Sequence, residues 1–229
     1  MSKRTKLEKF AENQRLENVF ENFSYEDPTL FVNVLQKVDY KGKWKSDYFK
    51  NAKPLVLELA CGRGEYSIGL AQMYPNQNYI GVDVKGARIW TGAKRAIDLK
   101  FSQVAFIRSK IETLPHFFAA EEVDQIWIIF SDPFLRKENR RLTSIYYLDS
   151  YLKYTHLQTS FHLKTDDDTL YEFSLKTIAD HPNYEIVQCS NNIYAEALQH
   201  PALEIKTYYE KMHLQKNKTI KYIEFKRVK

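Results

Sequence analysis

Short apolar segments alternate with amphipathic ones from residue 55 almost to the end of the chain. The apolar segments predict strands at Leu55–Leu59, Asn78–Val82, Val104–Ile107, Val123–Phe130, Ser160–Leu163, Tyr184–Cys189 and Thr219–Phe225. The segments between them predict helices at Glu65–Met73, Gly86–Lys100, Ile145–Leu157 and Leu170–Ala179, and a short helix or turn at Ile111–Phe118. This alternation is typical of an α/β fold with a mostly parallel central sheet and helices on both faces. No obvious crossover helix joins the last two strands directly, so we expect an antiparallel edge strand.

The first 40 residues do not follow this alternation. Apolar side chains recur there at roughly helical spacing, at Phe10, Leu16, Val19 and Phe20. This spacing predicts an amphipathic helix or a partly ordered arm, which Asp27–Pro28 would end. We therefore expect an N-terminal helical extension over residues 1–40 and one α/β domain over residues 41–229.

Composition and charge narrow the class of protein only slightly. With 229 residues and 44% hydrophobic content, the chain can bury the core of one globular domain. Its net charge of +5 permits a polyanionic partner without requiring one. Cys61 and Cys189 have neither metal-ligand nor disulfide spacing, so we expect no metal and a reducing compartment. The absence of a long apolar run and of a secretory signal predicts a cytoplasmic protein without a membrane partner.

A Gly-rich turn follows the first predicted strand. Glu58 lies in that strand, Gly62 and Gly64 follow it, and Asp83 ends the next strand. Glycines allow a tight turn and the close approach of a ligand, and an acid at the second strand end can accept hydrogen bonds from ribose hydroxyls. Because ligands of doubly wound sheets bind beyond the carboxyl ends of the strands, this pattern predicts a nucleoside site.

The residues after the turn indicate which nucleoside binds. A dinucleotide site needs a third glycine where this chain has Ser67, and Glu65 would repel a pyrophosphate. S-adenosylmethionine carries no phosphate, and its sulfonium and amine are cations that suit the carboxylate of Glu58. The pattern therefore favours S-adenosylmethionine over a nicotinamide cofactor. Cys61 is interpreted as a packing residue, because no histidine lies near it in sequence.

A second group of polar residues follows the most apolar strand. That strand ends in Ser131-Asp132-Pro133-Phe134, and four cations follow at Arg136, Lys137, Arg140 and Arg141. Asp132 is expected at the carboxyl end of the sheet, where catalysis is expected. The cations beside it could bind nucleic acid phosphates, although a solvated loop would have the same composition.

With these motifs, the chain resembles the bacterial tRNA (guanine-N7-)-methyltransferases. The Asp-Pro with its basic loop is one shared motif, and the acid and glycines of the cofactor half are another. Leu163-Lys164-Thr165-Asp166 resembles the family's Lys-Thr-Asp, and Thr207-Tyr208-Tyr209-Glu210 resembles its Thr-x-x-Glu motif. The resemblance covers roughly residues 40–226. It implies a Rossmann-like class I methyltransferase that transfers a methyl group from S-adenosylmethionine to N7 of a guanine at position 46, in the variable loop of tRNA.

The resemblance also implies roles for individual residues. Asp132 would be the catalytic carboxylate, and Arg136 would bind the substrate. The cofactor would contact Glu58, Gly62, Gly64, Asp83, Ser109 and Asp132. The guanine or its nucleoside would contact Asp166, Thr207, Tyr208, Tyr209 and Glu210, with Phe134 and the two tyrosines as possible stacking partners. The protein would act as a monomer or homodimer.

Several positions depart from the family pattern. Ala60 replaces a glycine, Ser131 replaces a common proline, and Ser109 stands where an acid or amide is usual. Ser131-Asp132-Pro133-Phe134 also partly resembles the motif of exocyclic-amine methyltransferases, which remains an alternative. A second alternative is a tRNA-binding scaffold without catalysis, because Ala60 and Ser109 could weaken cofactor binding.

Overall fold

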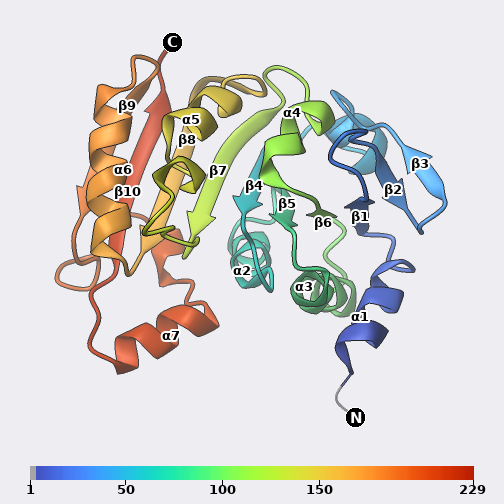
Figure 1. Ribbon diagram of the computed structural model, residues 1–229. Helices are drawn as coiled ribbons and strands as arrows, with labels where there is room; N and C mark the ends of the chain where they lie inside the picture. The colour runs from blue at the N-terminus through green and yellow to red at the C-terminus, as the bar shows by residue number, and fades with distance from the viewer. Residues whose placement is uncertain (1–3) are drawn as a thin grey trace. The chain divides into compact units, whose positions relative to one another are not determined.

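The computed structural model describes residues 4–229, and their contacts group into two compact units. The first unit extends to Ala119, and the second runs from Ala120 to Lys229. Figure 1 labels the helices and strands of both units. This boundary between units lies elsewhere than the predicted boundary between the N-terminal extension and the α/β domain at residue 40. The predicted division into domains stays a prediction.

The first unit contains a six-stranded sheet in the order β3-β2-β1-β6-β5-β4. Its strands are β1 (Val19–Asn22), β2 (Leu30–Val32), β3 (Gln36–Val38), β4 (Leu55–Leu59), β5 (Asn78–Asp83) and β6 (Val104–Arg108). β4, β5 and β6 are parallel neighbours, and β1 adds parallel to β6. β2 and β3 follow antiparallel to complete the far side of this sheet. Every residue of β4 and β5 is buried, which explains why their sequences are nearly continuous apolar runs.

The strand β1 was not predicted from the sequence. The helical spacing is confirmed only for α1 (Lys6–Asn13), whereas Val19 and Phe20 lie in β1 and are buried. Phe106 N–H donates to the carbonyl of Asn18 at 2.8 Å, and β1 pairs with β6 along this edge. Pairing with a distant strand has overridden the local spacing.

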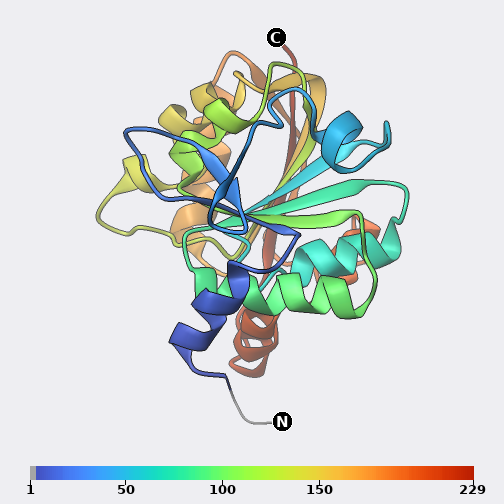
Figure 2. The same ribbon diagram turned by 90° about the vertical axis from the view of Figure 1, so that its right-hand side faces the viewer.

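Helices cover both faces of the first sheet. α2 (Glu65–Met73) and α3 (Gly86–Asp98) pack on each other and on β5 and β6, and α1 packs on α3. Figure 2 shows these three helices below the strands of this unit. On the other face, a one-turn π-helix (Trp44–Tyr48) packs through Trp44 on Phe20 and on α4 (Leu114–Phe117), where the indole N–H donates to Phe117 O at 2.8 Å. A short 3₁₀ turn (Ile111–Thr113) leads into α4.

The second unit contains a four-stranded sheet in the order β7-β8-β10-β9. Its strands are β7 (Val123–Ile129), β8 (Thr155–Thr165), β9 (Tyr184–Ser190) and β10 (Lys221–Arg227). β7 and β8 are parallel, whereas β10 runs antiparallel to both β8 and β9. The predicted antiparallel pairing is therefore confirmed, with β9 as the edge strand of this unit.

Helices α5 (Ile145–Tyr151) and α6 (Asp168–Asp180) share one face of the second sheet. Tyr151 of α5 packs on Phe161, and α6 contacts β8, β9 and β10. α5 is shorter than predicted because β8 begins at Thr155, whose hydroxyl donates to the carbonyl of Tyr151 at 2.9 Å. The remaining helices are 3₁₀ turns at Glu138–Arg140 and Pro201–Glu204, and α7 at Tyr208–Gln215.

Two features are absent from residues 4–229. Within this range, no helix is long and apolar enough to cross a membrane. The same residues contain no group of three or more histidine, cysteine, aspartate or glutamate side chains that could hold a metal ion.

Candidate functional site

Three predicted cofactor residues lie on neighbouring parallel strands of the first unit. Glu58 lies near the end of β4, Asp83 ends β5, and Ser109 follows β6. Ser109 N–H donates to the carbonyl of Asp83 at 3.2 Å, which joins two of these strand ends directly. The carboxyl ends of β4, β5 and β6 thus bring the predicted residues to one edge of the sheet, where ligands of this architecture bind.

In the Gly-rich turn, every second residue from 60 to 64 has a left-handed backbone conformation. Ala60, Gly62 and Gly64 have φ values of 57°, 54° and 64°. A Cβ on Gly64 would lie 2.4 Å from the Phe106 ring, so glycine is needed there for close packing. A Cβ on Gly62 would meet nothing within 4 Å, so this turn borders open space. Ala60 adopts the same backbone as a glycine, with the steric cost of a side chain.

Glu58 is buried and held by uncharged donors. Its Oε2 accepts hydrogen bonds from the backbone N–H and the hydroxyl of Ser67, at 2.7 and 2.5 Å. Burial raises the pKa of Glu58 to about 8, while the bonds from Ser67 oppose that rise. Among residues 4–229, Oε1 makes no hydrogen bond, so one carboxylate oxygen is available to a cationic ligand.

Asp83 fixes the turn from the neighbouring strand. Its Oδ2 accepts the Gly62 N–H at 2.8 Å, and its Oδ1 accepts the Lys85 N–H at 2.7 Å. The side chain is only 7% exposed. Each oxygen keeps a lone pair after these bonds, so the carboxylate can hold the turn and still accept from ribose hydroxyls.

Ser109 belongs to a hydrogen-bond chain with a defined direction. The Thr113 hydroxyl donates its one hydrogen to Lys110 O at 2.7 Å, so Ser109 must be the donor in its 2.7 Å contact with Thr113. Ser109 Oγ also accepts from the amide of Asn22, at 3.1 Å, at the end of β1. The hydroxyl therefore retains one acceptor lone pair and no donor for a ligand.

The loop that carries Asp132 is exposed and bent. Phe130 and Phe134, on either side of it, have φ values of 48° and 42°. Such backbone costs energy in bulky residues and often occurs at functional sites. Asp132 Oδ1 accepts the Phe134 N–H at 2.9 Å, which stabilises the bend. The neighbouring Ser131 hydroxyl is buried and has no hydrogen-bond partner among the described residues, so a ligand or water could supply one.

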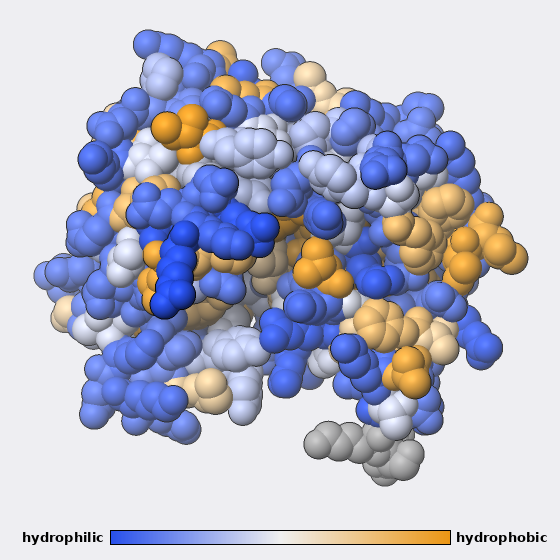
Figure 3. Space-filling view, in the orientation of Figure 1, coloured by the Kyte–Doolittle hydropathy of each residue, from blue (hydrophilic) through white to orange (hydrophobic). Residues whose placement is uncertain are grey.

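The basic loop after Asp132 divides into exposed and buried cations. Arg136, Lys137 and Arg140 are exposed, and the most hydrophilic side chains in Figure 3 lie over the loop between β7 and α5. Arg141 is 1% exposed, and its Nε donates to Pro133 O at 2.8 Å. The prediction that all four cations could bind phosphates is therefore wrong for Arg141, which holds the loop instead.

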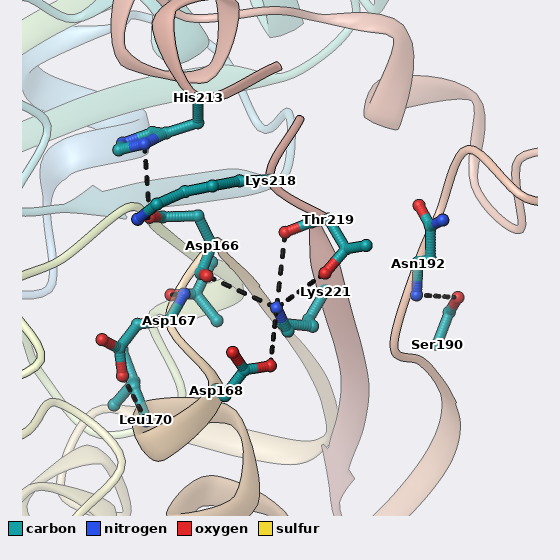
Figure 4. A network of polar contacts seen from close by, with 11 residues as sticks. Asp166, Asp167, Asp168, Leu170, Ser190, Asn192, His213, Lys218, Thr219 and Lys221 are labelled. Carbon is teal, nitrogen blue, oxygen red and sulfur yellow. Dashed lines mark hydrogen bonds and ion pairs between the residues drawn. The ribbon is translucent and has the colours of Figure 1, made fainter. Parts of the chain in front are cut away.

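Asp166 follows β8, and its carboxylate is contacted by the side chains of Lys218 and His213 (Figure 4). Its Oδ2 accepts from Lys218 Nζ at 2.5 Å and lies 3.3 Å from Nδ1 of His213. The carboxylate of Asp166 raises the pKa of Lys218. β7 and β8 are parallel neighbours with Ile129 opposite Lys164, so Asp132 and Asp166 follow adjacent strand ends in this unit.

The Thr-x-x-Glu motif forms the start of α7. Thr207 caps the helix by accepting the Glu210 N–H at 3.2 Å. Glu210 Oε1 accepts from the Tyr194 hydroxyl at 2.6 Å and pairs with Lys164 Nζ at 2.8 Å, with both charged side chains fully buried. Burial lowers the pKa of Lys164, and the carboxylate of Glu210 opposes this shift. Contact of Glu210 with guanine stays a prediction, because the described contacts give it a structural role.

The sequence did not single out two residues that position the candidate site. Ser67 appeared only as a missing glycine, yet it binds Glu58. Lys164 was noted only as the lysine of the Lys-Thr-Asp motif, with no role of its own. In the structure it pairs with Glu210 and donates to the carbonyls of Leu203 and Ile205. A serine at the third position of the glycine motif was the available signal for Ser67. Cys61 is buried and burial raises its thiol pKa, which fits the predicted packing role.

The strand order of the first unit, its Gly-rich turn and the acids on β4 and β5 define a class I S-adenosylmethionine-dependent methyltransferase fold. Solved structures support this class. The crystal structure of the 16S rRNA methyltransferase KamB superposes with a TM-score of 0.63 at 12% identity, over 85% of this chain and 97% of that one. Geranyl diphosphate C-methyltransferase from Streptomyces coelicolor, solved with S-adenosyl-L-homocysteine, gives 0.53 at 15% identity over 81% and 74%.

Sequence relatives define the family more narrowly. The tRNA (guanine-N(7)-)-methyltransferase of Bacteroides fragilis is 42% identical over 97% of this chain and 85% of its own. The protein of the same name in Christiangramia forsetii is 39% identical over 99% of both. A family model described as a putative methyltransferase matches residues 52–223. The chain therefore belongs to the tRNA (guanine-N7-)-methyltransferase family.

Proposed function

We propose that the chain transfers the methyl group of S-adenosylmethionine to N7 of a guanine in tRNA, at position 46 of the variable loop. The observation that supports this proposal is that the chain, as a member of the family, has the three acids Glu58, Asp83 and Asp132. Each of them lies near the carboxyl end of a parallel strand. A tRNA substrate also supports the expected cytoplasmic location. The predicted monomer or homodimer stays a prediction.

The first unit supplies the groups for the cofactor. Glu58 has a free carboxylate oxygen for the cationic amine or sulfonium, and the open space beside Gly62 leaves room for the ligand. Asp83 would accept from the ribose hydroxyls, and Ser109 would accept from the exocyclic amine of adenine. These residues fit S-adenosylmethionine better than a dinucleotide, because Glu58 and Glu65 would repel a pyrophosphate.

The second unit supplies the groups for the base. S-adenosylmethionine provides an electrophilic methyl group, and its S–CH₃ bond breaks as the N7–CH₃ bond forms. N7 of guanine has an unprotonated lone pair, so alignment matters more than a general base. The positive charge moves onto the purine during this step, and the exposed carboxylate of Asp132 would stabilise it. Asp166 would hold the N1 and N2 hydrogens of guanine, and Arg136 would contact a phosphate.

The test is methyl transfer from labelled cofactor to unmodified tRNA, with the modified position located by aniline cleavage. We expect label at one guanine of the variable loop. Label on an exocyclic amine would support the alternative methyltransferase. An absence of cofactor binding in calorimetry, with tRNA binding retained, would support the scaffold without catalysis.

A further inference from the structure

The N-terminal helix α1 is joined by a buried hydrogen bond to the segment that follows Asp83. Asn13 of α1 is 1% exposed, and its Nδ2 donates to the carbonyl of Gly86 at 2.7 Å. Among the described residues its Oδ1 has no hydrogen-bond partner, so the side chain is committed to this one bond. Gly86 begins α3, and Lys85 before it donates its N–H to Asp83 Oδ1 at 2.7 Å. α1 therefore holds the backbone next to the bond that orients the Asp83 carboxylate.

Gly86 also allows α1 to approach closely. A Cβ at this position would lie 2.6 Å from Cε1 of Phe10 in α1 and 3.0 Å from Cδ of Arg108. A contact of 2.6 Å is too short for a Cβ, so any side chain here would displace its neighbours. The absence of a Cβ at Gly86 is what allows the Phe10 ring to lie against the start of α3.

Phe10 connects α1 to the end of β6 as well. The guanidinium of Arg108, the last residue of β6, lies over the Phe10 ring, 4.9 Å from its centroid. Arg108 Nη1 also pairs with Glu21 Oε1 of β1 at 2.9 Å. Ser109, the proposed adenine contact, is the next residue along the chain. One aromatic ring of α1 thus contacts the segments that follow both β5 and β6.

The outer contacts of α1 lie on α3, beside which Figure 1 shows it. Trp90 Nε1 of α3 donates to Glu12 Oε2 at 2.7 Å, and the Lys9 ammonium lies 4.7 Å from the centroid of the Trp90 ring. α1 has only eight residues, and isolated helices of that length are marginal in water. Its helical order therefore depends on these contacts and on those at Gly86.

We propose that α1 is a positioning element for the cofactor, in which Asn13 and Phe10 set the affinity for the adenosine half of S-adenosylmethionine. The inference rests on the proposed function, because it uses the proposed places of the ribose at Asp83 and of adenine at Ser109. α1 acts through these residues and does not contact the cofactor itself. Because coupling between two sites is reciprocal, bound cofactor should in turn stabilise the docked helix.

The first test is cofactor affinity in calorimetry. Asn13→Ala should weaken binding of S-adenosyl-L-homocysteine about fivefold, because the Gly86 carbonyl loses its buried donor. 5′-Methylthioadenosine, which has the adenosine half without the amino acid, should lose affinity by the same factor. KM for S-adenosylmethionine should rise while kcat at saturating cofactor stays unchanged. The matched control is Gln14→Ala, which removes an exposed amide from the next residue.

The second test uses the close contact at Gly86. Gly86→Ala should weaken binding of both probes, because the added methyl group displaces Phe10. Gly86→Ala/Phe10→Ala should bind them more tightly than Gly86→Ala alone, since the smaller side chain makes room for that methyl group. In the unaltered protein, S-adenosyl-L-homocysteine should slow hydrogen exchange of the α1 amides. A purely structural role would lower the thermal unfolding midpoint of these variants without changing their affinities at lower temperature.

Three outcomes would overturn this proposal. Unchanged affinity in a folded Asn13→Ala protein is one, and an equal loss in Gln14→Ala is another. The third is a loss of affinity for S-adenosyl-L-homocysteine without a loss for 5′-methylthioadenosine, which would place the effect in the amino-acid half. If the unaltered protein binds neither probe, the proposed function fails instead, so the two failures are distinguishable.

Discussion

The two units hold their acids in different ways. In the first unit, Glu58 and Asp83 accept hydrogen bonds from uncharged donors, which are backbone N–H groups and one hydroxyl. In the second unit, Glu210 and Asp166 are paired with lysines. Neutral donors orient a carboxylate and leave its charge in place, whereas lysines cancel it.

This difference matches the charges of the two proposed ligands. An uncompensated carboxylate attracts the cationic cofactor, and Glu58, whose raised pKa of about 8 leaves it protonated in the free protein near pH 7, becomes charged when that ligand binds. The same charge would repel tRNA, so the second unit benefits from cancelling it. Asp132 is the exception among the candidate site acids of the second unit, because among the described residues it has a backbone N–H partner and no cation. Its free charge is therefore expected to act in the reaction.

The largest effect is expected when the cation of the buried pair between Lys164 and Glu210 is removed. Lys164→Met should lower the free energy of unfolding by about 3–5 kcal/mol, because it leaves the Glu210 carboxylate buried without a counter-charge. Urea denaturation measures the change. Lys164→Met/Glu210→Leu should recover most of it, and Lys218→Met should cost far less because Lys218 lies at the surface, where solvent screens its pair with Asp166. A mild effect of Lys164→Met alone would contradict the structural role of the pair.

The next largest effect should come from the uncompensated acid. Asp132→Asn should lower methyl transfer about 100-fold, because an amide cannot stabilise the charge that develops on the purine. Transfer of labelled methyl groups to tRNA measures the change, and the thermal unfolding midpoint should not move. Asp180→Asn, at the exposed end of α6, is the matched control. Turnover close to that of the unaltered protein would remove Asp132 from the mechanism.

A third prediction concerns the pH dependence of cofactor binding. Burial raises the pKa of Glu58 from 4.5 to about 8, so near pH 7 the free protein holds a proton that a cationic ligand should expel. Affinity for S-adenosylmethionine should therefore rise by up to about tenfold per pH unit below pH 8. Calorimetry in buffers of different ionisation enthalpy should detect about one proton released per cofactor.

The same shift predicts how stability varies with pH. Between about pH 4.5 and pH 8, the folded state keeps a proton on Glu58 that the unfolded state has lost. The free energy of unfolding without cofactor should therefore fall as pH rises through this window. Glu58→Gln should remove both dependences, and their persistence in this variant would assign them to another group.

The smallest effect should come from the backbone of the Gly-rich turn. Ala60→Gly should raise the free energy of unfolding by up to about 1 kcal/mol, because Ala60 has a φ of 57° that strains an L-residue. Gly62→Ala, at a φ of 54° with open space for a methyl group, should lower it by a similar amount. Denaturation curves that change in the same direction for both variants would show that φ is not the cause.

The alternation of apolar segments predicted four of the parallel strands well, whereas β8 begins at Thr155, five residues before its predicted start at Ser160. β4, β5, β6 and β7 lie within about one residue of their predicted bounds, because strands buried on both faces must be continuous apolar runs. β1 was missed because pairing with β6 decides its conformation. α7 was missed because the residue on its buried side is Glu210, whose burial depends on Lys164, far away in sequence. Apolar residues do not recur at helical spacing in residues 208–215, so the local sequence did not predict that helix.

A repeated four-residue pattern shows the same limit for the candidate site. Thr5 and Glu8 form a complete capping box, with both reciprocal bonds present. Thr207 and Glu210 have the same spacing, yet only the threonine caps, because the glutamate turns inward to a lysine. The two segments share the same Thr-x-x-Glu spacing. The role of each glutamate depended on a partner that local sequence does not contain.

The hydrogen-bond chain that ends β1 has a consequence for the choice of purine. Asn22 donates to Ser109, which donates to Thr113, which donates to the carbonyl of Lys110, so both hydroxyl hydrogens of the chain already have acceptors. Under the proposed placement of adenine, Ser109 can meet a 6-amino group and has no hydrogen to offer a 6-keto oxygen. Two acceptors would then face each other if hypoxanthine replaced adenine. Under that placement the N-terminal strand would favour an amino purine over a keto purine, and the deaminated cofactor should bind more weakly.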